Sequence, residues 1–343
     1  MTDLVLVVEG QRLAGFKRLV LSRGLEQLAA AFALTVGGLE PINKGAACTI
    51  ERDDGLVLLT GYIGSVDDSY DGHNHETSLS GRSKMADVVD CSAVVPGGEF
   101  RNQTLEQISE RLCAPFGVEV VSERMARKPF PKFAVQEAET CAETIGRAAK
   151  AEGAAISSDD HGDLVIRASG VYLSAATGLT QPGNILRGSR HQSWDERFSS
   201  YTVKSQSSGT AETYGRSASA AKATVEDAAV TRPRPMVMIA ESQVGLAGAR
   251  KRANWERATR AARSQRITYT VRGWGEGDGI WTPGYLVSVN DGLFGIKDEL
   301  LIVSATLTKD KNGETTEIEI IRPEALDVLA EPPKKKKDGG FPW

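Results

Sequence analysis

The stretch from Val66 to Ser92, VDDSYDGHNHETSLSGRSKMADVVDCS, gathers imidazoles, carboxylates and a thiol. These groups most often bind metals or carry protons in proteins. His73 and His75 flank Asn74, which spells the name of a nuclease motif. Nucleases of that class place their residues at wide intervals around a metal, whereas these histidines are two positions apart beside an expected turn. The pattern therefore favours the solvated tip of a β-hairpin.

A calcium-binding loop is the next interpretation to weigh for this stretch. With Gly72 at the sixth loop position, Asp67 and Asp71 fall on the first and fifth positions. The third position is then Ser69. The twelfth is Ser78, which cannot supply the bidentate carboxylate that completes such a site. Because most of this ligand set is weak, the hairpin tip remains the preferred interpretation.

A glycine-rich run, GWGEGDG at residues 273–279, invites comparison with a phosphate-binding loop. It lacks the G-x-G-x-x-G spacing, and no helix follows whose amide groups could bind an anion. Glu276 and Asp278 would also repel a phosphate. The run is better explained as a connection between strands.

A basic segment follows the middle of the chain. Its cations are Arg250, Lys251, Arg252, Arg257, Arg260, Arg263 and Arg266, with Glu256 as the acidic residue among them. A local charge near +6 could meet nucleic acid or an acidic protein surface. The alternative is a solvated helix face with Trp255 and Ala258 packing beneath it. A second run, Lys334 to Lys337, lies in a Pro- and Gly-rich tail that ends in Phe-Pro-Trp and reads as disordered.

No grouping of residues points to an enzyme. The four histidines are His73, His75, His161 and His191, and no Ser/His/Asp or Cys/His arrangement is present. The pairs Asp53-Asp54 and Asp159-Asp160 lie in expected turns, where water would leave their pKa values unshifted. The cysteines (Cys48, Cys91, Cys113 and Cys141) are too widely spaced for a zinc site or a disulfide framework and suggest buried thiols. We therefore expect no catalytic, metal or cofactor-binding residue.

Two regions of the chain read as β-structure and resemble each other. The first covers residues 32–82 and the second residues 267–322. In each region an alternating strand ends in glycine, a second strand ends in Asp-Gly, and a long hairpin follows. The hairpins turn at Asp71-Gly72 and Asn312-Gly313, which tolerate the positive φ of a tight turn. The order of elements predicts two similar small β-barrels.

An α/β segment separates these regions, so the predicted fold is mainly β with an α/β insertion. Thr104 with Gln107 and Thr140 with Glu143 form capping boxes that start two helices. A hairpin turning at His161-Gly162 follows the second helix. The predicted domains are a first β-barrel (1–97), an inserted α/β domain (98–170), a linker (171–187), a second β-barrel (188–325) with a long loop (205–235) and a helix (242–264), and a disordered basic tail (326–343).

Length and charge set broad limits. A chain of 343 residues can form two or three domains with their own cores, and a net charge of −4 does not favour a polyanion as a general partner. The N-terminus has no signal-peptide pattern. Because no apolar run reaches the roughly 18 residues that span a bilayer, we expect a soluble protein without a membrane anchor.

One ordered series of motifs resembles the Mu-like phage tail baseplate hub proteins, the family of the late control D and P gene products. Its centre is GRSKMADVVDC, Gly81 to Cys91, with Val88 where that family tends to have leucine. Further matches follow in register: NQTLEQISERLCAPFGVEV, DERFSSYTVKSQ, RPRPMVMIAES, GWGEGDGIWTPGYLVSV and ELLIVSATLT. The resemblance extends from about residue 4 to residue 325.

The resemblance implies a structural role in the baseplate of a contractile tail, assembled in the host cytoplasm. Members of the family are trimeric hubs that join the central spike to the tail tube and contact other baseplate proteins. Two similar barrels in each of three chains would present six comparable positions, which suits an adaptor between three-fold and six-fold partners. The tape-measure protein and DNA would pass through the lumen, and the basic helix would face a protein neighbour. No cofactor is implied.

Two alternatives remain open at this point. A tail-associated peptidoglycan hydrolase would need an additional catalytic domain or a buried acid–base pair. A nucleic-acid-binding module would use the cations between Arg250 and Arg266.

Overall fold

Most of the chain is β-structure, as the alternation of apolar and polar residues predicts. The computed structural model describes residues 4–38, 42–125, 128–206, 219–239, 246–275 and 280–326. The N-terminal region consists of β1 (Leu4–Val8), β2 (Gln11–Leu13), β3 (Arg18–Gly24), β4 (Ala31–Gly37), β5 (Ala47–Arg52), β6 (Val57–Tyr70) and β7 (His75–Ser83). The long β6–β7 hairpin confirms the turn predicted at Asp71-Gly72.

The C-terminal region repeats this plan. It consists of β13 (Leu173–Ser174), β14 (Leu179–Gln181), β15 (Ile185–Gln192), β19 (Gln265–Arg272), β20 (Tyr285–Asp291), β21 (Ile296–Asp310), β22 (Gly313–Ile321) and a 3-10 turn, η3 (Pro323–Ala325). Ile318 and Ile320 are fully buried on one face of β22, and the glutamates that alternate with them lie on the other face. The hairpin predicted at Asn312-Gly313 is confirmed.

The strands of the two regions pair in the same spatial order. The N-terminal order is β3-β4-β7-β6-β5-β1, and the C-terminal order is β15-β19-β22-β21-β20 followed by β13 and β14. The long strands carry bulges at matching places, after Ile63 in β6 and after Ile302 in β21. The similarity predicted from the sequence is therefore present in the pairing itself.

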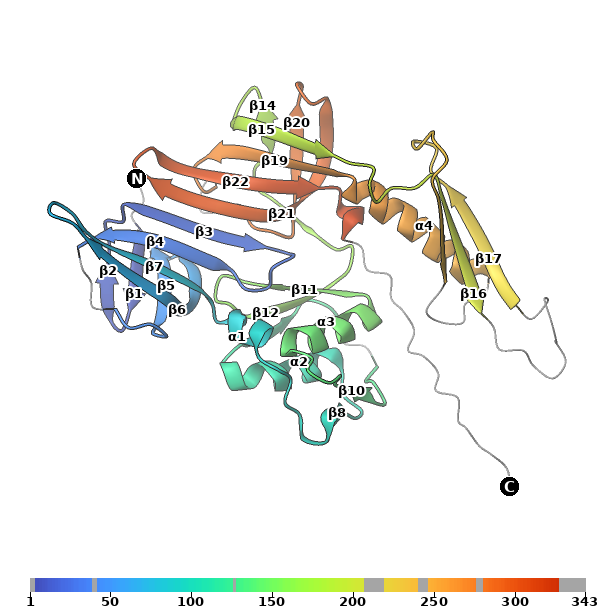
Figure 1. Cartoon of the computed structure of the whole chain (residues 1–343), viewed down its shortest axis with the longest axis horizontal. Helices are drawn as coiled ribbons and strands as arrows, with labels where there is room; N and C mark the ends of the chain where they lie inside the picture. The colour runs from blue at the N-terminus through green and yellow to red at the C-terminus, as the bar shows by residue number, and fades with distance from the viewer. Residues whose placement is uncertain are drawn as a thin grey trace.

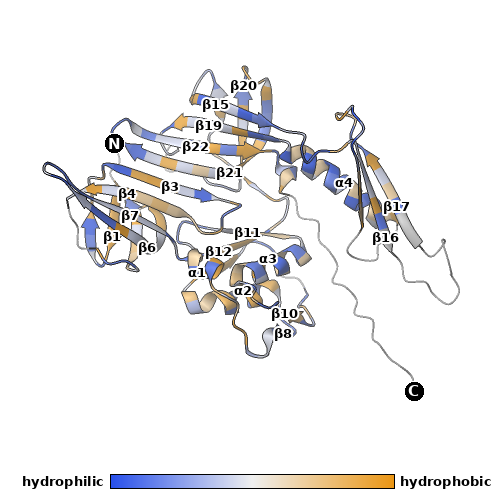
Figure 2. Ribbon diagram, in the orientation of Figure 1, coloured by the Kyte–Doolittle hydropathy of each residue, from blue (hydrophilic) through white to orange (hydrophobic). Residues whose placement is uncertain are grey.

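Direct pairing of β3 with β21 joins the two regions into one sheet (Figure 1). One hydrophobic cluster runs through both regions and includes Leu21, Leu34, Leu307 and Ile318. Figure 2 shows apolar segments alternating with polar ones along these strands. Among the strand pairs that the structure describes, none closes either region on itself, so two separate barrels remain a prediction.

The α/β unit lies beneath the sheet in Figure 1. It contains α1 (Met85–Asp90), η1 (Pro96–Gly98), β8 (Glu99–Phe100), α2 (Leu105–Cys113), η2 (Ala114–Phe116), β9 (Val120–Ser122), β10 (Phe133–Ala134), α3 (Cys141–Glu152), β11 (Ala154–Ser158) and β12 (Leu164–Ala168). Both predicted capping boxes are present, at Thr104 and Thr140. Met85 and Val88 are fully buried in the core of this unit, so its packing begins before the boundary expected at residue 98.

A third unit extends to one side. It contains β16 (Ser200–Gln206), β17 (Ser219–Glu226), β18 (Pro235–Ile239) and α4 (Leu246–Arg263), with α4 packed on the three-stranded sheet. The long loop expected over 205–235 is wrong in part, because β17 and the start of β18 lie within that range. Its residues 207–218 are outside the described part. The expected linker 171–187 likewise carries β13, β14 and the start of β15, because its short apolar runs add to the edge of β20. None of the helices in the described ranges combines the length and apolar character needed to span a membrane.

Candidate functional site

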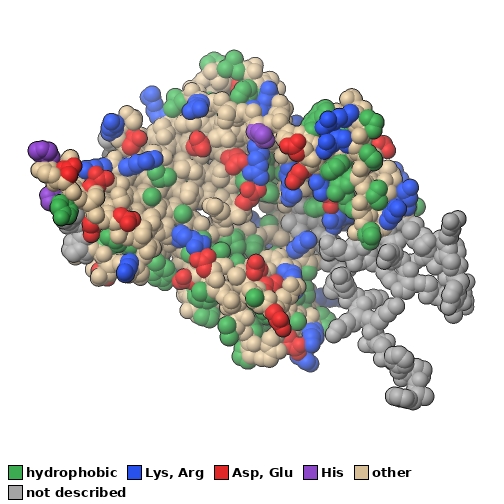
Figure 3. Space-filling model, viewed as in Figure 1, with side chains coloured by type: hydrophobic (Ala, Val, Ile, Leu, Met, Phe, Trp, Pro, Cys, Tyr) green, Lys and Arg blue, Asp and Glu red, His purple; other side chains and the backbone are tan. Residues whose placement is uncertain are grey.

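The histidine-containing stretch is the exposed end of the β6–β7 hairpin. The backbone N–H groups of His73 and Asn74 both donate to Asp71 Oδ1, each at 2.7 Å. These bonds hold the pKa of Asp71 below its usual value. Both histidines are exposed, and the ring of His75 stacks on Tyr70 at 6.1 Å between centroids. Figure 3 shows histidines at the far left end of the molecule, beyond the sheet. The predicted solvated hairpin tip is confirmed.

Within the part of the chain that the structure describes, no other residues join these histidines to complete a metal site. Across the described ranges of the chain, no three His, Cys, Asp or Glu side chains are grouped so that they could hold a metal ion. Ser78, at the twelfth position of the calcium-loop comparison, lies in β7 opposite Asp67. The carboxylates of this stretch therefore decorate a turn and a strand edge.

The corresponding hairpin in the C-terminal region repeats this turn in detail. Asp310 Oδ1 accepts a hydrogen bond from the Asn312 N–H at 2.7 Å, as Asp71 does at the first tip. The hydroxyl of buried Thr77 donates to the Gly38 carbonyl at 3.2 Å, and that of buried Thr316 donates to the Gly273 carbonyl at 2.7 Å.

The same sequence interval separates Asp71 from Asp310 and Thr77 from Thr316. The two regions are thus matched down to single hydrogen bonds. Sequence reasoning missed these threonines because nothing in the residue type indicates which carbonyl a hydroxyl will meet.

The glycine-rich run is a structural connection between β19 and β20, as predicted. Gly273 has φ +74°, and its carbonyl is the acceptor for Thr316. Trp274 and Trp281 are buried in the shared core. The backbone N–H of Trp281 donates to the backbone carbonyl of Trp274 at 2.9 Å. Glu276 and Asp278 lie outside the described residues. The described ends of the run therefore serve packing.

The basic helix α4 buries a stripe that differs from the predicted one. Ala249, Ala253, Glu256, Thr259 and Ala262 are buried, whereas Trp255 and Ala258 are only partly covered. The buried stripe is narrow because alanine and threonine allow the helix to lie close to the β16–β18 sheet.

Much of the helix's charge is satisfied within the chain. Glu256 pairs with Arg252 at 2.9 Å and with Arg260 at 3.0 Å, one turn before and one turn after it. The Arg263 Nε–H donates to the Ala325 carbonyl at 2.9 Å. The cation-rich surface is therefore smaller than the sequence suggests, and exposed Arg250 and Lys251 are its outermost part.

Arg266, which follows α4, belongs to the sheet and not to a helix surface. It pairs with Glu26 of the N-terminal region at 2.8 Å and with Glu319 of β22 at 2.7 Å. The hydrogen bonds that its guanidinium donates to both carboxylates raise the pKa of Arg266 further above an already high value. The residue therefore links the two halves of the sheet across a long sequence interval.

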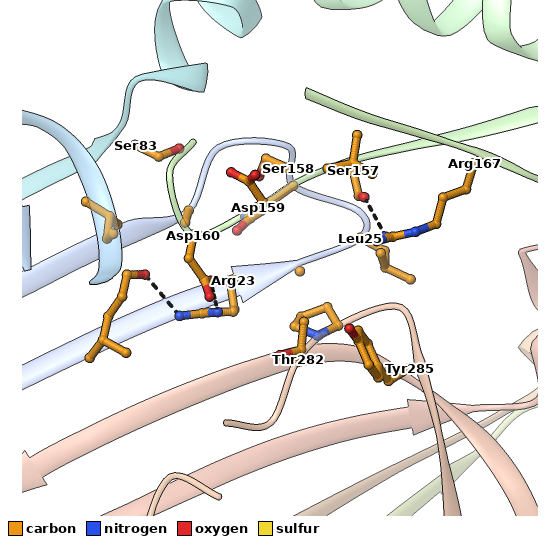
Figure 4. A pocket seen from close by; sticks show the side chains of 17 residues that line it. Arg23, Leu25, Ser83, Ser157, Ser158, Asp159, Asp160, Arg167, Thr282 and Tyr285 are labelled. Carbon is orange, nitrogen blue, oxygen red and sulfur yellow. Dashed lines mark hydrogen bonds and ion pairs between the residues drawn. The ribbon is translucent and has the colours of Figure 1, made fainter. Parts of the chain in front are cut away.

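Asp160 is not in an open turn, which corrects the expectation for the pair Asp159-Asp160. Its carboxylate forms an ion pair with Arg23, whose other guanidinium nitrogen donates to the Leu58 carbonyl at 3.0 Å (Figure 4). Burial raises the pKa of Asp160, although the guanidinium opposes that shift. The pair lies in a cavity of about 200 Å³ between the α/β unit and the sheet. Asp54, by contrast, is exposed and has a lowered pKa through its bond to Arg52.

The β11–β12 turn around Asp160 fastens the α/β unit to the sheet. Lys84, at the end of β7, pairs with Asp163 at 2.6 Å and donates to the Gly117 carbonyl at 3.0 Å. Gly162 has φ +75°, and a β-carbon there would lie 2.8 Å from the Lys84 side chain. This junction was not predicted, because its residues come from three distant parts of the chain.

The four cysteines are free thiols. Cys48, Cys113 and Cys141 are buried as expected, but Cys91 is exposed, because it follows the last turn of α1. Burial raises the pKa of the Cys48 and Cys113 thiols to about 12. Neither thiol is activated as a nucleophile.

Sequence models of three domains match the chain. Residues 3–83 match the N-terminal domain of Mu phage baseplate assembly protein GpP-like proteins. Residues 85–168 match the second domain of baseplate hub protein gp44-like proteins, and residues 245–329 match the fourth domain of Mu phage baseplate assembly protein GpP.

Whole-chain comparisons agree with the domain matches. The chain is 32% identical to the baseplate hub protein gp44 of Escherichia phage Mu, over 98% of this chain and 92% of that protein. The crystal structure of the 43 kDa tail protein of prophage MuSo2 from Shewanella oneidensis is 34% identical, with a TM-score of 0.84 over 95% of this chain and 100% of that one. The tail protein of Neisseria meningitidis MC58, at 24% identity and TM-score 0.76, covers 94% of this chain and 99% of its own and shares the fold.

Proposed function

This chain belongs to the family of Mu-like phage baseplate hub proteins, and from that premise we propose that three copies of it form a ring between a three-fold spike and a six-fold tail tube. It is a structural hub protein of a phage-tail baseplate.

The repeated strand order is the observation that carries the proposal. Each chain contains two regions with the same pairing order, matching bulges and matching hydrogen bonds at Thr77 and Thr316. Three chains would therefore present six comparable sheet regions around one axis. A ring of this kind would have true three-fold symmetry and approximate six-fold symmetry. One face could therefore bind the three-fold spike and the other face the six-fold tail tube. Contacts between successive copies would be heterologous and cyclic.

The expected partners are the central spike protein, the tail tube and other baseplate proteins of a contractile tail. The tape-measure protein and DNA would pass through the lumen. The ring would form in the host cytoplasm and remain in the virion, without a membrane anchor or cofactor. The domain boundaries 1–97, 98–170, 171–187, 188–325 and 326–343 remain part of this proposal, with the α/β unit taken to begin near α1.

The role we propose is non-enzymatic. Peptidoglycan hydrolysis by a retaining or inverting mechanism needs two carboxyl groups that face one substrate bond. Asp160, whose pKa is raised by burial, is committed to Arg23 instead. A zymogram in which the purified protein cleared peptidoglycan would overturn this part of the proposal.

We propose that exposed Arg250 and Lys251, at the start of α4, face an acidic protein neighbour. The pairing of Arg252 and Arg260 with Glu256 leaves less charge for a phosphate backbone than the sequence suggests. A salt-dependent shift of DNA in a gel would favour the nucleic-acid alternative.

The decisive experiment is a measurement of the mass of the purified protein in solution, combined with electron microscopy of negatively stained particles. We expect a trimer that images as a ring with a central hole. A monomer at every concentration, or a compact particle without a hole, would contradict the proposal.

A further inference from the structure

An apolar groove of about 460 Å³ lies between the α/β unit and α4. The α/β unit contributes residues of α3 and β11, among them Ala149, Ala155 and Ile156, and α4 contributes Trp255. Ile156 and Trp255 are each only partly covered by the described residues. A concave apolar site of this size commonly receives apolar side chains or a ligand.

Cations stand around this groove, and none of the described residues that line it is acidic. The cations are Lys150, Arg167, Arg252 and Arg263. Arg167 and Arg252 are already paired with glutamates that lie outside the lining. Lys150 and Arg263 are exposed, and within the part of the chain that the structure describes neither lies within ion-pair distance of a carboxylate. The groove therefore suits an apolar segment that carries carboxylates at its ends.

The described part of the chain ends in the wall of this groove. Leu326 lines the groove and follows Ala325, which is fully buried against Ala262 of α4. The Arg263 side chain donates to the Ala325 carbonyl at 2.9 Å, and the Leu326 N–H donates to the Pro323 carbonyl at 3.1 Å. These contacts fix the point at which the next residues leave α4, so those residues start at the groove.

The sequence after Leu326 has the composition that the groove requires. Residues 327–331 read Asp-Val-Leu-Ala-Glu, an apolar centre between two carboxylates. Because an extended chain advances about 3.3 Å per residue, Val328 and Leu329 lie within about 10 Å of Leu326. The match to the fourth domain of GpP extends to residue 329, so the start of this segment belongs to that domain. Lys334 to Lys337 follow, and the cations of the groove would repel them.

We propose that residues 327–331, the docking segment, bind in the groove of their own chain. Val328 and Leu329 pack between Ile156 and Trp255. The carboxylate of Asp327 faces Arg263, and that of Glu331 faces Lys150 at the other end. The docking segment thereby ties the α/β unit to α4, so that the two units flanking the sheet are held as one body. It would do so in a single chain as well as in a ring.

Tethering favours this occupant over a partner from solution. The docking segment begins at the wall of its own site, so its effective concentration there is in the millimolar range. A peptide of another protein would have to reach that concentration and also displace the tethered segment. The last three residues, Phe341 to Trp343, are also apolar, but they come after the lysine run.

Bimane fluorescence tests the placement in the full-length protein, because tryptophan quenches bimane on contact. In a Cys91→Ser background the remaining thiols are buried, and Ala330→Cys provides the labelling site. We expect the label to be quenched and Trp255→Phe to relieve the quenching. The same label at Asp338→Cys is the control and should not respond to Trp255→Phe. A label at position 330 that is equally bright with Trp255 and with Phe would overturn the docking.

Two truncations separate the docking segment from the rest of the tail. A stop after Leu326 removes it, whereas a stop after Pro333 keeps it and removes residues 334–343. Anilinonaphthalene sulfonate is an anionic dye that fluoresces in apolar sites. Its fluorescence should rise several-fold with the shorter chain and stay at the full-length level with the longer one. Equal fluorescence in all three proteins, or a rise already after the stop at Pro333, would contradict the assignment. Thermal melting checks that each chain folds, and if the shorter one does not, the bimane measurement decides.

A peptide and a mixing experiment identify the occupant. A synthetic peptide of residues 327–333 should displace the dye from the shorter chain, and the same peptide with Leu329→Asp should bind about tenfold or more weakly. Equal binding of the two peptides would overturn the burial of Leu329. Labelled Trp255→Phe protein is then mixed with an excess of unlabelled protein that retains Trp255. We expect no quenching on mixing, whereas quenching would place the segment on a neighbouring copy and overturn docking within the chain.

Discussion

Arg23 and Asp160, 137 positions apart in the sequence, form an ion pair in which the arginine side chain is only 9% exposed. The guanidinium also donates to the Leu58 carbonyl, so it is held between the sheet and the α/β unit. Together with the Lys84–Asp163 ion pair, this pair docks the α/β unit on the sheet.

Removing the carboxylate should therefore be costly. Asp160→Asn leaves Arg23 buried without its counter-charge, and we expect the free energy of unfolding to fall by about 2–3 kcal/mol. Urea denaturation at pH 7 measures the change. Asp54→Asn is the control, because Asp54 pairs with Arg52 at the surface, where solvent screens the pair, and its loss should change stability much less. Equal losses in the two variants would contradict this account of the junction.

Gly162→Ala tests the close approach of the β11–β12 turn to the sheet. A β-carbon at Gly162 would meet the Lys84 side chain at 2.8 Å and the Thr60 carbonyl at 3.1 Å, in addition to the strain of φ +75°. We expect a loss of about 2–3 kcal/mol in thermal or urea unfolding. Gly45→Ala has a similar φ of +81° with open space around it, and should lose only about 1 kcal/mol. The difference between the variants isolates the steric contribution.

The matched threonines should behave alike. Thr77→Val and Thr316→Val each keep the side-chain shape but leave a glycine carbonyl without its hydroxyl donor, so each should cost about 1–2 kcal/mol of unfolding free energy. Thr77 should cost slightly more, because its single hydroxyl proton is shared between the Gly38 carbonyl and the Asp68 carboxylate. Denaturation with urea provides the comparison. A large loss of unfolding free energy in one variant with none in the other would show that the matched hydrogen bonds do not contribute equally to stability.

The ion pair between Asp227 and Arg197 should make the free energy of unfolding depend on pH. Hydrogen bonds from Arg197 hold the pKa of this buried carboxylate below its ordinary value of 3.8. Because the folded pKa is lowered, the stabilisation is fully present above about pH 4 and is lost as the pH falls through the folded pKa. Asp227→Asn should therefore destabilise the protein strongly at pH 7, by about 2–3 kcal/mol, and progressively less as the pH falls below about 4. Unfolding curves at a series of decreasing pH values check this, and a pH-independent difference would contradict it.

The elements that local chemistry controls were predicted well. The capping boxes at Thr104 and Thr140, the turns at Asp71 and Asn312, and the alternation in β22 are short-range signals, and the structure contains each of them. The repeat was also predictable, because it consists of the same short-range signals in the same order.

Contacts between distant segments were not predictable. Asp160 was expected to be solvated, since a sequence does not show that Arg23 will lie against the β11–β12 turn. The buried face of α4 was predicted at the wrong residues. Small residues such as Ala249 and Ala253 are weakly apolar, so the sequence does not mark their face of the helix as clearly as Trp255 marks its own. The β17 strand was missed because its Ser- and Ala-rich sequence resembles that of a loop.

The pairing of β3 with β21 also has a consequence for synthesis. Residues 18–24 leave the ribosome early, but the strand that covers their edge, residues 304–309, is made near the end of translation. During most of elongation the N-terminal half therefore carries a bare edge that another nascent chain could occupy. Correct maturation depends on the last strands arriving before a neighbouring polypeptide does, so slow translation of the final segment, or a premature stop within it, should produce entangled aggregates instead of a shortened soluble protein.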